Sequence, residues 1–347
     1  MGVDHQPAAG PAAPGNARRR RVGGDGRSGR GGRVGRSRRG GRGGRAGWAP
    51  VIFLGPFGLL FALFFLLPIG YAIYESFLKV HVSGLGLGPS STTTEFAGLA
   101  NYTQVFSDPS FLQGVGRVLL FGVVQVPVML LFATILALLL DSVAARFKRF
   151  FRLAFFLPYG IPGVIAAILW SFLYLPGLSP VVAALHGAGF GSVNFLGVNS
   201  VLWSIANIVT WEYTGYNMLI IYAGLQAIPA DLYEAARLDG ASEWRVATRI
   251  KLPLVTGSLV LTTVFSIIGT LQLFAEPQVL RSVTDDISSS YTPNLLAYTQ
   301  AFTSNNPNYA AAIAVVLAIG TFILSFGFLR LVQRRGAGSA GRAGMGV

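Results

Sequence analysis

The 347-residue chain contains no cysteine, and only 12% of its residues are charged. The absence of cysteine excludes disulfide bridges, thiol nucleophiles and cysteine-based metal sites. Soluble domains carry about 25% charged residues, so a share half as large points to a chain that resides in lipid. A hydrophobic share of 52% and a mean hydropathy of +0.56 support the same interpretation.

The sequence also lacks the motifs of common enzyme classes. Its three histidines, His5, His81 and His186, are far apart and do not have the spacing of a zinc site. No phosphate-binding loop of the Gly-x-x-x-x-Gly-Lys-Ser/Thr type occurs, so a partner must perform any ATP hydrolysis. We therefore expect no catalytic residue, no metal site and no cofactor bound by this chain.

Most of the net charge of +13 lies in residues 1–47, which hold twelve Arg and two Asp among Gly, Ala and Pro. Such a stretch buries too little apolar surface to offset chain entropy, which predicts a disordered tail. Without aromatic residues it cannot stack on bases, so we favour a topology-setting cytoplasmic tail over nucleic-acid binding. Residues 336–347 are predicted to be a second flexible cytoplasmic tail.

Six hydrophobic segments between these tails approach the roughly 20 apolar residues that a membrane helix needs. They are residues 50–76, 114–140, 151–174, 200–225, 255–277 and 309–332. The predicted fold class is therefore all-α, a polytopic membrane protein whose transmembrane domain is residues 48–335. Internal prolines such as Pro127 and Pro162 are compatible with this fold, because neighbouring membrane helices satisfy the freed carbonyl groups.

The distribution of basic residues predicts the orientation. Of the 27 Lys and Arg residues, 24 lie in the two tails and around the second and fourth connections. Only Lys79, Arg117 and Arg281 lie elsewhere. Because cytoplasmic segments carry the excess of Lys and Arg, six spans with both termini in the cytoplasm are predicted.

The connection after the fourth segment, residues 226–253, predicts a helix, a turn and a second helix. Pro229 and Asp231 suit a helix start, and Gly240 suits the left-handed position after a helix end. Ser242 is placed to cap the second helix. Periodicity alone is equally compatible with a solvated helix pair, so the residue pattern has to decide.

That pattern, E-A-A-x-x-D-G-A followed by I-x-L-P, resembles the EAA loop of the permease subunits of ATP-binding-cassette (ABC) importers. The matching residues are Glu234, Ala235, Ala236, Asp239, Gly240, Ala241, Ile250, Leu252 and Pro253. Trp244 fits an aromatic position of the motif, Arg237 adds a charge for a docking partner, and Ala247 departs from the usual Phe. The resemblance implies a coupling helix that sits in a cleft of an ATPase subunit.

Three further segments resemble carbohydrate-uptake permeases. Residues 96–102 are similar to their periplasmic F-x-G-L-x-N-Y region, and residues 155–159 to the start of their third span. Phe274, Glu276 and Pro277 resemble the end of span five in the first permease of the maltose, lactose and glycerol-phosphate type.

This resemblance implies the ABC type I importer permease fold, in a bacterial inner (plasma) membrane, with a sugar as cargo. The implied partners are a second permease subunit, two ATPase subunits that use ATP, an extracytoplasmic solute-binding protein and membrane lipid.

Polar side chains inside membrane spans usually face the bundle interior or a pathway. In the related maltose permease, spans four to six line the sugar site. By that resemblance the candidate substrate path consists of Trp211, Tyr216, Asn217 and Gln272. Trp and Tyr stack on sugar rings, and Asn and Gln bond hydroxyls. Helix–helix hydrogen bonding or an aromatic interfacial belt is an equal alternative for each residue.

Three alternatives stay open. The same architecture can import amino acids, peptides or anions, which the carbohydrate-permease motifs oppose. An ion-coupled secondary transporter typically shows inverted repeats and discontinuous helices, and the sequence shows no clear repeat. An intramembrane enzyme needs paired carboxylates, a His cluster or a Ser–His set, and the spans show no such pattern.

Overall fold

The computed structural model describes residues 49–82, 92–142, 145–191 and 193–343, so the predicted tail, residues 1–47, lies outside the described residues. Residues 57–347 form one compact unit, and the first residues of α1 belong to another. The helices up to residue 187 are α1 (Ala49–Phe61), η1 (Ala62–Leu66), α2 (Leu67–Glu75), α3 (Ala100–Ser107), α4 (Pro109–Asp141), α5 (Lys148–Phe156), η2 (Leu157–Gly160), α6 (Gly163–Tyr174) and α7 (Pro180–Gly187). Those that follow are α8 (Val201–Gln226), α9 (Ala230–Leu238), α10 (Glu243–Val246), η3 (Ala247–Lys251), α11 (Leu252–Leu254), α12 (Thr256–Leu271), α13 (Ala275–Leu280), α14 (Pro293–Phe302) and α15 (Pro307–Ala343).

A two-stranded antiparallel hairpin corrects the all-α prediction. Strand β1 (Leu78–Val82) pairs with β2 (Thr92–Phe96), with Leu78 opposite Phe96. Both strands are rich in Val and Thr, whose branched side chains favour extended backbone. The hairpin is anchored by Asn101, which is buried and donates to the carbonyls of Ser76 and Leu78 at 2.8 Å each. The Asn of the F-x-G-L-x-N-Y region therefore has a structural role here.

The membrane helices agree with the prediction in part. Four described helical stretches are long and apolar enough to span a bilayer: Ile52–Glu75, Pro109–Asp141, Thr256–Leu280 and Pro307–Arg334. The helix α8 is long enough, but polar residues such as Asn207 and Glu212 lower its hydropathy. At the C-terminus α15 stays helical to Ala343, within the segment predicted to be a flexible tail.

The predicted third span is broken rather than continuous. The stretches Lys148–Gly160 and Gly163–Tyr174 meet at an angle of 96°, and together they would make a fifth candidate span. Ile161 has extended backbone, because the proline that follows it disfavours a helical conformation at the preceding residue, and Pro162 itself immediately precedes α6. Pro127, by contrast, lies inside the continuous helix α4 as predicted.

The predicted fifth span is also interrupted. The helix α12 ends at Leu271, and α13 begins at Ala275. Of the three residues between them, Phe274 has φ −146° and ψ −52°, which is not helical. Irregular backbone at membrane depth is tolerated only where protein buries it or where it lines a cavity, so this break indicates surrounding protein or a cavity at this position.

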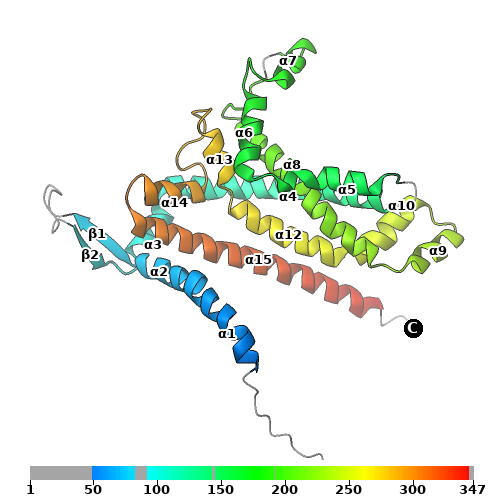
Figure 1. The fold of residues 1–347 in the computed structure, drawn as a ribbon, viewed down its shortest axis with the longest axis horizontal. Coiled ribbons are helices and arrows are strands. Elements are labelled where there is room, and N and C mark those ends of the chain that lie inside the picture. Colours follow the sequence, from blue (N-terminus) through cyan, green and yellow to red (C-terminus); the bar gives the residue numbers. More distant parts are fainter. Residues whose placement is uncertain (1–48, 83–91, 143–144, 192, 344–347) are drawn as a thin grey trace, which may run out of the picture. The chain divides into compact units, whose positions relative to one another are not determined.

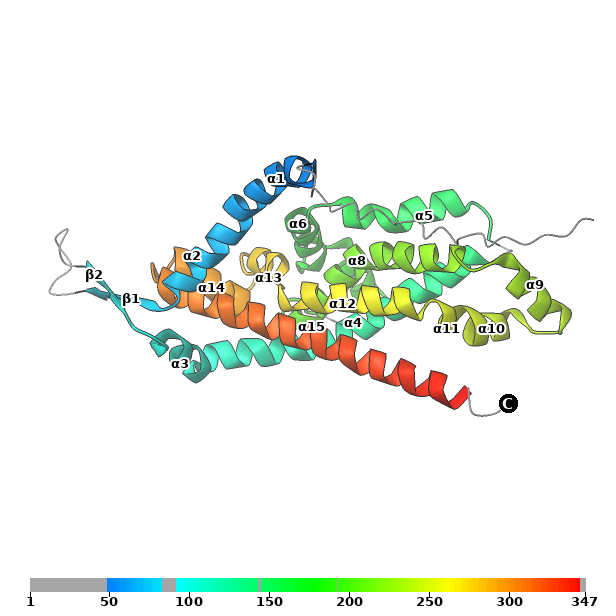
Figure 2. The ribbon, with the colours of Figure 1, turned by 90° about the horizontal axis from the view of Figure 1, so that it is seen from below.

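The core is built around the contact of α4 with α8. Buried Ala133 and Ala137 of α4 pack against Met218, Ile221 and Leu225 of α8. Lipid is as apolar as these side chains, so close packing rather than the hydrophobic effect holds such helices together. Figures 1 and 2 show α12 running alongside this pair, and α15 running beside α12.

Two glycines of α8 allow its neighbours to approach. A Cβ atom on Gly215 would lie 1.8 Å from the carbonyl oxygen of Phe155 in α5, and one on Gly224 would lie 2.3 Å from Ser258 Oγ in α12. The first obstacle is backbone, which cannot rotate away, whereas the second is a short side chain. Gly215 is therefore the position where the packing of α5 on α8 depends on glycine.

We predict that Gly215→Ala destabilises the protein by about 3 kcal/mol or more, because α5 must shift to admit the methyl group. The matched control is Gly257→Ala in α12, where a Cβ atom meets nothing within 4 Å. The midpoint of thermal unfolding in detergent should fall for the first variant only. Equal midpoints for both variants would contradict the packing described.

Candidate functional site

The loop between α8 and α12 has the local structure predicted for it. The helix α9 follows Pro229, and it ends in a turn in which Gly240 has φ +79°. The amide of Gly240 donates to the carbonyl of Arg237 at 3.0 Å, and that of Ala241 to Ala236 at 2.9 Å. This pair of bonds is the Schellman motif, in which the left-handed residue is usually glycine.

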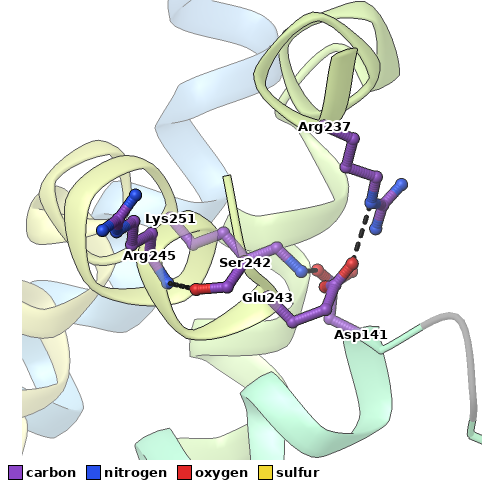
Figure 3. Close-up of polar contacts among 6 residues, drawn as sticks. All are labelled: Asp141, Arg237, Ser242, Glu243, Arg245 and Lys251. Atoms are coloured by element: carbon purple, nitrogen blue, oxygen red, sulfur yellow. Dashed lines mark hydrogen bonds and ion pairs between the residues drawn. The ribbon is translucent and has the colours of Figure 1, made fainter. Parts of the chain in front are cut away.

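The second helix of the loop is capped as predicted. Ser242 has extended backbone, and its hydroxyl accepts a bond from the amide of Arg245 at 3.4 Å (Figure 3). The helix α10 then continues through a π-helical turn, η3, into α11. The local helix–turn–helix prediction is confirmed.

Most predicted coupling residues are accessible. Trp244 is 76% exposed although it is large and apolar, and Leu238, which was not among the predicted coupling residues, is 88% exposed. The remaining coupling residues divide into exposed Glu234, Ala235, Arg237, Asp239, Gly240 and Pro253, and half-buried Ala236, Ala241, Ile250 and Leu252. Exposed apolar groups ringed by charged groups are typical of a surface that a partner protein covers.

An ion pair joins the two helices of the loop. The Arg237 guanidinium donates from Nε to Glu243 Oε1 at 2.8 Å, across the turn at Gly240 (Figure 3). This hydrogen bond lowers the pKa of Glu243 and raises the pKa of Arg237. Because both side chains are solvent-exposed, the pair orients the turn more than it stabilises the fold.

A cavity of about 380 Å³ lies between α4, α8 and α12 and extends to the break before α13. Three of the four predicted substrate-path residues line it: Tyr216, Asn217 and Gln272. The volume is within the range of about 300–1,000 Å³ that is usual for small-molecule pockets. The break after α12 brings Gln272 into this space.

The fourth predicted residue, Trp211, does not line this cavity. Its ring packs edge-on against Trp170 of α6, with the ring centroids 5.7 Å apart. Tyr216, although it lines the cavity, also stacks on Tyr159 of η2 at a centroid distance of 4.5 Å. Both contacts are aromatic packing between helices, which differs from the hydrogen bonding or interfacial belt given as the alternative for these residues.

Two cavity residues were missed from the sequence, and a third was noted only as part of a motif. Gln125 of α4 and Tyr213 of α8 line the space, as does Glu276 of α13. Gln125 lies in an otherwise apolar segment, which was the available signal. The structure also corrects the statement that no carboxylates pair within the spans. Glu212 and Glu276 both approach the position that a Cβ on Gly163 would take, with oxygens 3.6 Å and 3.7 Å away.

A family model of the inner membrane components of binding-protein-dependent transport systems matches residues 129–337, which include both the loop and most of the cavity. The chain belongs to this family. It is therefore a multi-pass membrane permease, a transport component rather than an enzyme. The helix breaks between η2 and α6 and between α12 and α13 resemble the discontinuous helices of secondary transporters. The family match nevertheless assigns this chain to the binding-protein-dependent transport systems.

Curated relatives of the permease align over most of their length. It is 32% identical to the lactose transport system permease protein LacF of Rhizobium radiobacter, over 81% of this chain and 91% of the relative. It is 30% identical to the sn-glycerol-3-phosphate transport system permease protein UgpA of Agrobacterium fabrum, over 82% and 95%. A probable ABC transporter permease, YurN of Bacillus subtilis, is 32% identical over 80% and 93%.

A solved structure shares the fold of the permease. It is a bacterial ABC transporter involved in the import of the acidic polysaccharide alginate, with a TM-score of 0.71 and 20% identity. The alignment covers 83% of this chain and 96% of that one. The permease therefore has the ABC type I importer permease fold.

A buried ion pair holds the loop of the permease against its membrane helices. Lys251 Nζ lies 2.5 Å from Asp141 Oδ2 at the end of α4, and the two side chains are only 6% and 7% exposed. Gln226, at the end of α8, donates to the other Asp141 oxygen at 2.7 Å. The Lys251 ammonium also lies over the ring of Tyr233 in α9, 4.9 Å from its centroid. The Asp141 carboxylate thus joins α4 to α8 through Gln226 and to the loop through Lys251, and Figure 3 shows the contact with Lys251.

We predict that Lys251→Met destabilises the permease by about 3–5 kcal/mol, because the Asp141 carboxylate stays buried without its partner. The double variant Lys251→Met with Asp141→Asn removes both charges and should recover most of the lost stability. Thermal unfolding of the detergent-purified permease measures both effects.

A control for this prediction is Arg237→Gln, which breaks the exposed pair with Glu243 and should leave the unfolding midpoint nearly unchanged. A loss of stability in Arg237→Gln as large as that in Lys251→Met would contradict the distinction between the two ion pairs.

Proposed function

We propose that this permease is a transmembrane subunit of a bacterial ABC importer and forms part of the path of a sugar across the inner membrane. The observation that carries the proposal is that one helix, α8, links an exposed turn to a polar cavity. Gln226 at the end of α8 bonds the residue that anchors the loop, and Asn217 of the same helix lines the cavity. The names of the relatives, which include lactose and glycerol-phosphate permeases, support a sugar or related polyol as cargo.

The proposed partners are a second permease subunit, two ATPase subunits and an extracytoplasmic binding protein. An exposed Leu238 and Trp244 on a charged turn offer the ATPase both apolar and ionic contacts. A solved alginate transporter of the same fold, with a TM-score of 0.70, is in complex with a ligand-bound periplasmic protein. This supports delivery of the solute from outside the membrane.

In the proposed mechanism, closure of the ATPase subunits on bound ATP displaces the exposed turn. The buried Lys251–Asp141 pair and Gln226 pass this displacement to the ends of α4 and α8. The permease pair then alternates between outward-facing and inward-facing states. This chain makes and breaks no covalent bond in the cycle.

The proposed topology has six spans with both termini in the cytoplasm. It counts the bent pair α5–α6 as one span and α8 as another, in addition to the four apolar candidates. The excess of basic residues in alternate connections supports this orientation. The coupling loop is then cytoplasmic, whereas α3 and the segment between α13 and α14 face outward.

The absence of native cysteine allows a direct test of topology. Single cysteines at exposed Ser107 and Ser288 should react with a membrane-impermeant maleimide in intact cells, and one at Arg245 should react only after permeabilisation. Labelling of Arg245→Cys in intact cells would overturn the orientation. Absence of labelling at both outer positions in a folded, membrane-inserted protein would do the same.

The coupling role is tested at Gly240. We predict that Gly240→Val lowers ATP-driven sugar uptake by about tenfold, because a β-branched residue in a left-handed turn costs about 1–2 kcal/mol. Gly240→Asn is the matched control, since asparagine tolerates this conformation, and should retain most of the uptake. Uptake is measured in proteoliposomes that hold the assembled transporter, and co-purification of the ATPase subunit is measured alongside.

A Gly240→Val permease that is membrane-inserted but transports like the unaltered protein would refute the role of this turn. Equal losses in the Val and Asn variants would show that the side chain matters, and not the left-handed backbone.

A further inference from the structure

The described residues that line the cavity include many polar side chains and one carboxyl group but no basic side chain, and this composition indicates which cargo the cavity can bind. Its polar lining comes from Gln125, Tyr213, Tyr216, Asn217, Ser266, Thr270, Gln272 and Glu276. None of the described residues that line it is Lys, Arg or His. Sites that bind phosphate, sulfonate or carboxylate groups ordinarily use Arg, Lys or clustered backbone amides.

The buried amides at the cavity present unpaired acceptors. Asn217 is 2% exposed, and its Nδ2 donates to the Tyr213 carbonyl at 3.0 Å, which fixes the amide orientation because a carbonyl can only accept. Its Oδ1 has no hydrogen-bond partner among the described residues, and neither does Gln125 Oε1. A buried acceptor without a donor is costly, so these atoms favour a ligand that donates hydrogen bonds.

Carboxyl groups close one end of the cavity. Glu276 is 7% exposed and lines it, and Glu212, which does not line it, approaches the same point beside Gly163 as Glu276 does. Within the described structure, Glu212 Oε2 has no hydrogen-bond donor. An anion in the cavity would meet carboxyl groups and no cationic side chain among the described lining residues, in a medium of low dielectric constant where an uncompensated charge is costly.

The helix ends that face the cavity also disfavour an anion. The last turn of α12, with Gly269 and Thr270, lines the cavity and presents the carbonyl end of a 16-residue helix. That end carries partial negative charge. The amide end of the short helix α13 also lies there, but Glu276 in its first turn offsets the partial positive charge.

We propose that this cavity binds an uncharged or ammonium-bearing sugar and excludes sugars that carry phosphate, sulfonate or carboxylate groups. Hydroxyl or ammonium protons of the ligand donate to the Glu276 carboxyl group, and to Asn217 Oδ1 and Gln125 Oε1 once these side chains rotate to expose those buried atoms to the cavity. The inference rests on the proposed function, because it assigns the cavity to the sugar path. It separates this permease from the glycerol-phosphate permeases among its relatives and from the transporter of acidic alginate.

The test uses the complete transporter with its own binding protein in proteoliposomes, supplied with ATP. The substrate is an equimolar mixture of uncharged sugars and polyols, amino sugars, and anionic analogues: galactose, maltose, lactose, raffinose, glycerol, glucosamine, galacturonate, sulfoquinovose and sn-glycerol 3-phosphate. Mass spectrometry of the vesicle contents identifies what accumulates. Accumulation of uncharged or amino members alone is expected.

The possible outcomes distinguish a failure of the charge-selectivity inference from a failure of the proposed sugar-import function. Accumulation of an anionic sugar at a rate equal to or above the uncharged members overturns the charge inference and leaves the sugar-import function standing. Accumulation of no sugar, by a transporter whose ATPase activity still responds to its binding protein, overturns the proposed function and the inference with it.

Variants locate the selectivity in the cavity. Glu276→Gln should reduce the preference for galactose over galacturonate by about tenfold, because it removes a carboxylate without changing shape. Glu276→Asp, which keeps the charge, should retain that preference. Asn217→Ala should raise the half-saturation for the accumulated sugar. An unchanged preference in Glu276→Gln, or unchanged half-saturation in Asn217→Ala, would place selectivity outside this cavity.

Discussion

The ion pair between Lys251 and Asp141 is the interaction on which the arrangement of the loop between α8 and α12 depends. Two opposite charges that are both more than nine-tenths buried are stable only if they stay together, since either one alone would be left in a medium of low dielectric constant. The pair joins residues 110 positions apart in the sequence, and Gln226 brings a third element to the same carboxylate. The ends of α4, α8 and the loop therefore cannot separate without exposing or isolating a charge. A displacement of the loop is consequently transmitted to the ends of α4 and α8.

Breaks in two membrane helices create the second constraint. Backbone groups freed by a break must be satisfied, and in lipid this requires protein or a lined cavity around them. The break between η2 and α6 is covered by α8, where Glu212 approaches Gly163 and Tyr216 stacks on Tyr159. The break between α12 and α13 opens onto the cavity that Asn217 and Gln272 line. Each break thus lies against α8, which explains why this helix is more polar than its neighbours.

Sequence reasoning succeeded where the cause of a structure is local. Pro229, Gly240 and Ser242 determine a helix start, a left-handed turn and a cap through their own backbone preferences, and the structure confirms all three. It failed where the cause is a contact between distant segments. Nothing near Lys251 in the sequence indicates that its partner is Asp141, and nothing near Pro162 distinguishes a broken span from the tolerated proline at position 127. The hairpin at residues 78–96 was missed because two short strands weigh little against long apolar helices. The coupling role of the loop and the sugar path stay predictions.

The loop and the cavity are connected through helices whose lengths are known. Asn217 precedes Gln226 by nine residues of continuous helix, roughly 14 Å at 1.5 Å per residue. Gln272 caps α12, whose 16 residues begin just after the segment that carries Lys251. Both cavity walls are therefore stiff helices whose loop-side ends lie next to one ion pair. In the proposed cycle a displacement of the turn at Gly240 tilts α8 and α12 as rigid helices. The non-helical Phe274 is the point at which α12 can change direction relative to α13. Asn217 belongs to α8 and Glu276 to α13, so a ligand bonded to both would resist a movement of one helix relative to the other. Release of the cargo would then be coupled to the same rotation that the loop drives.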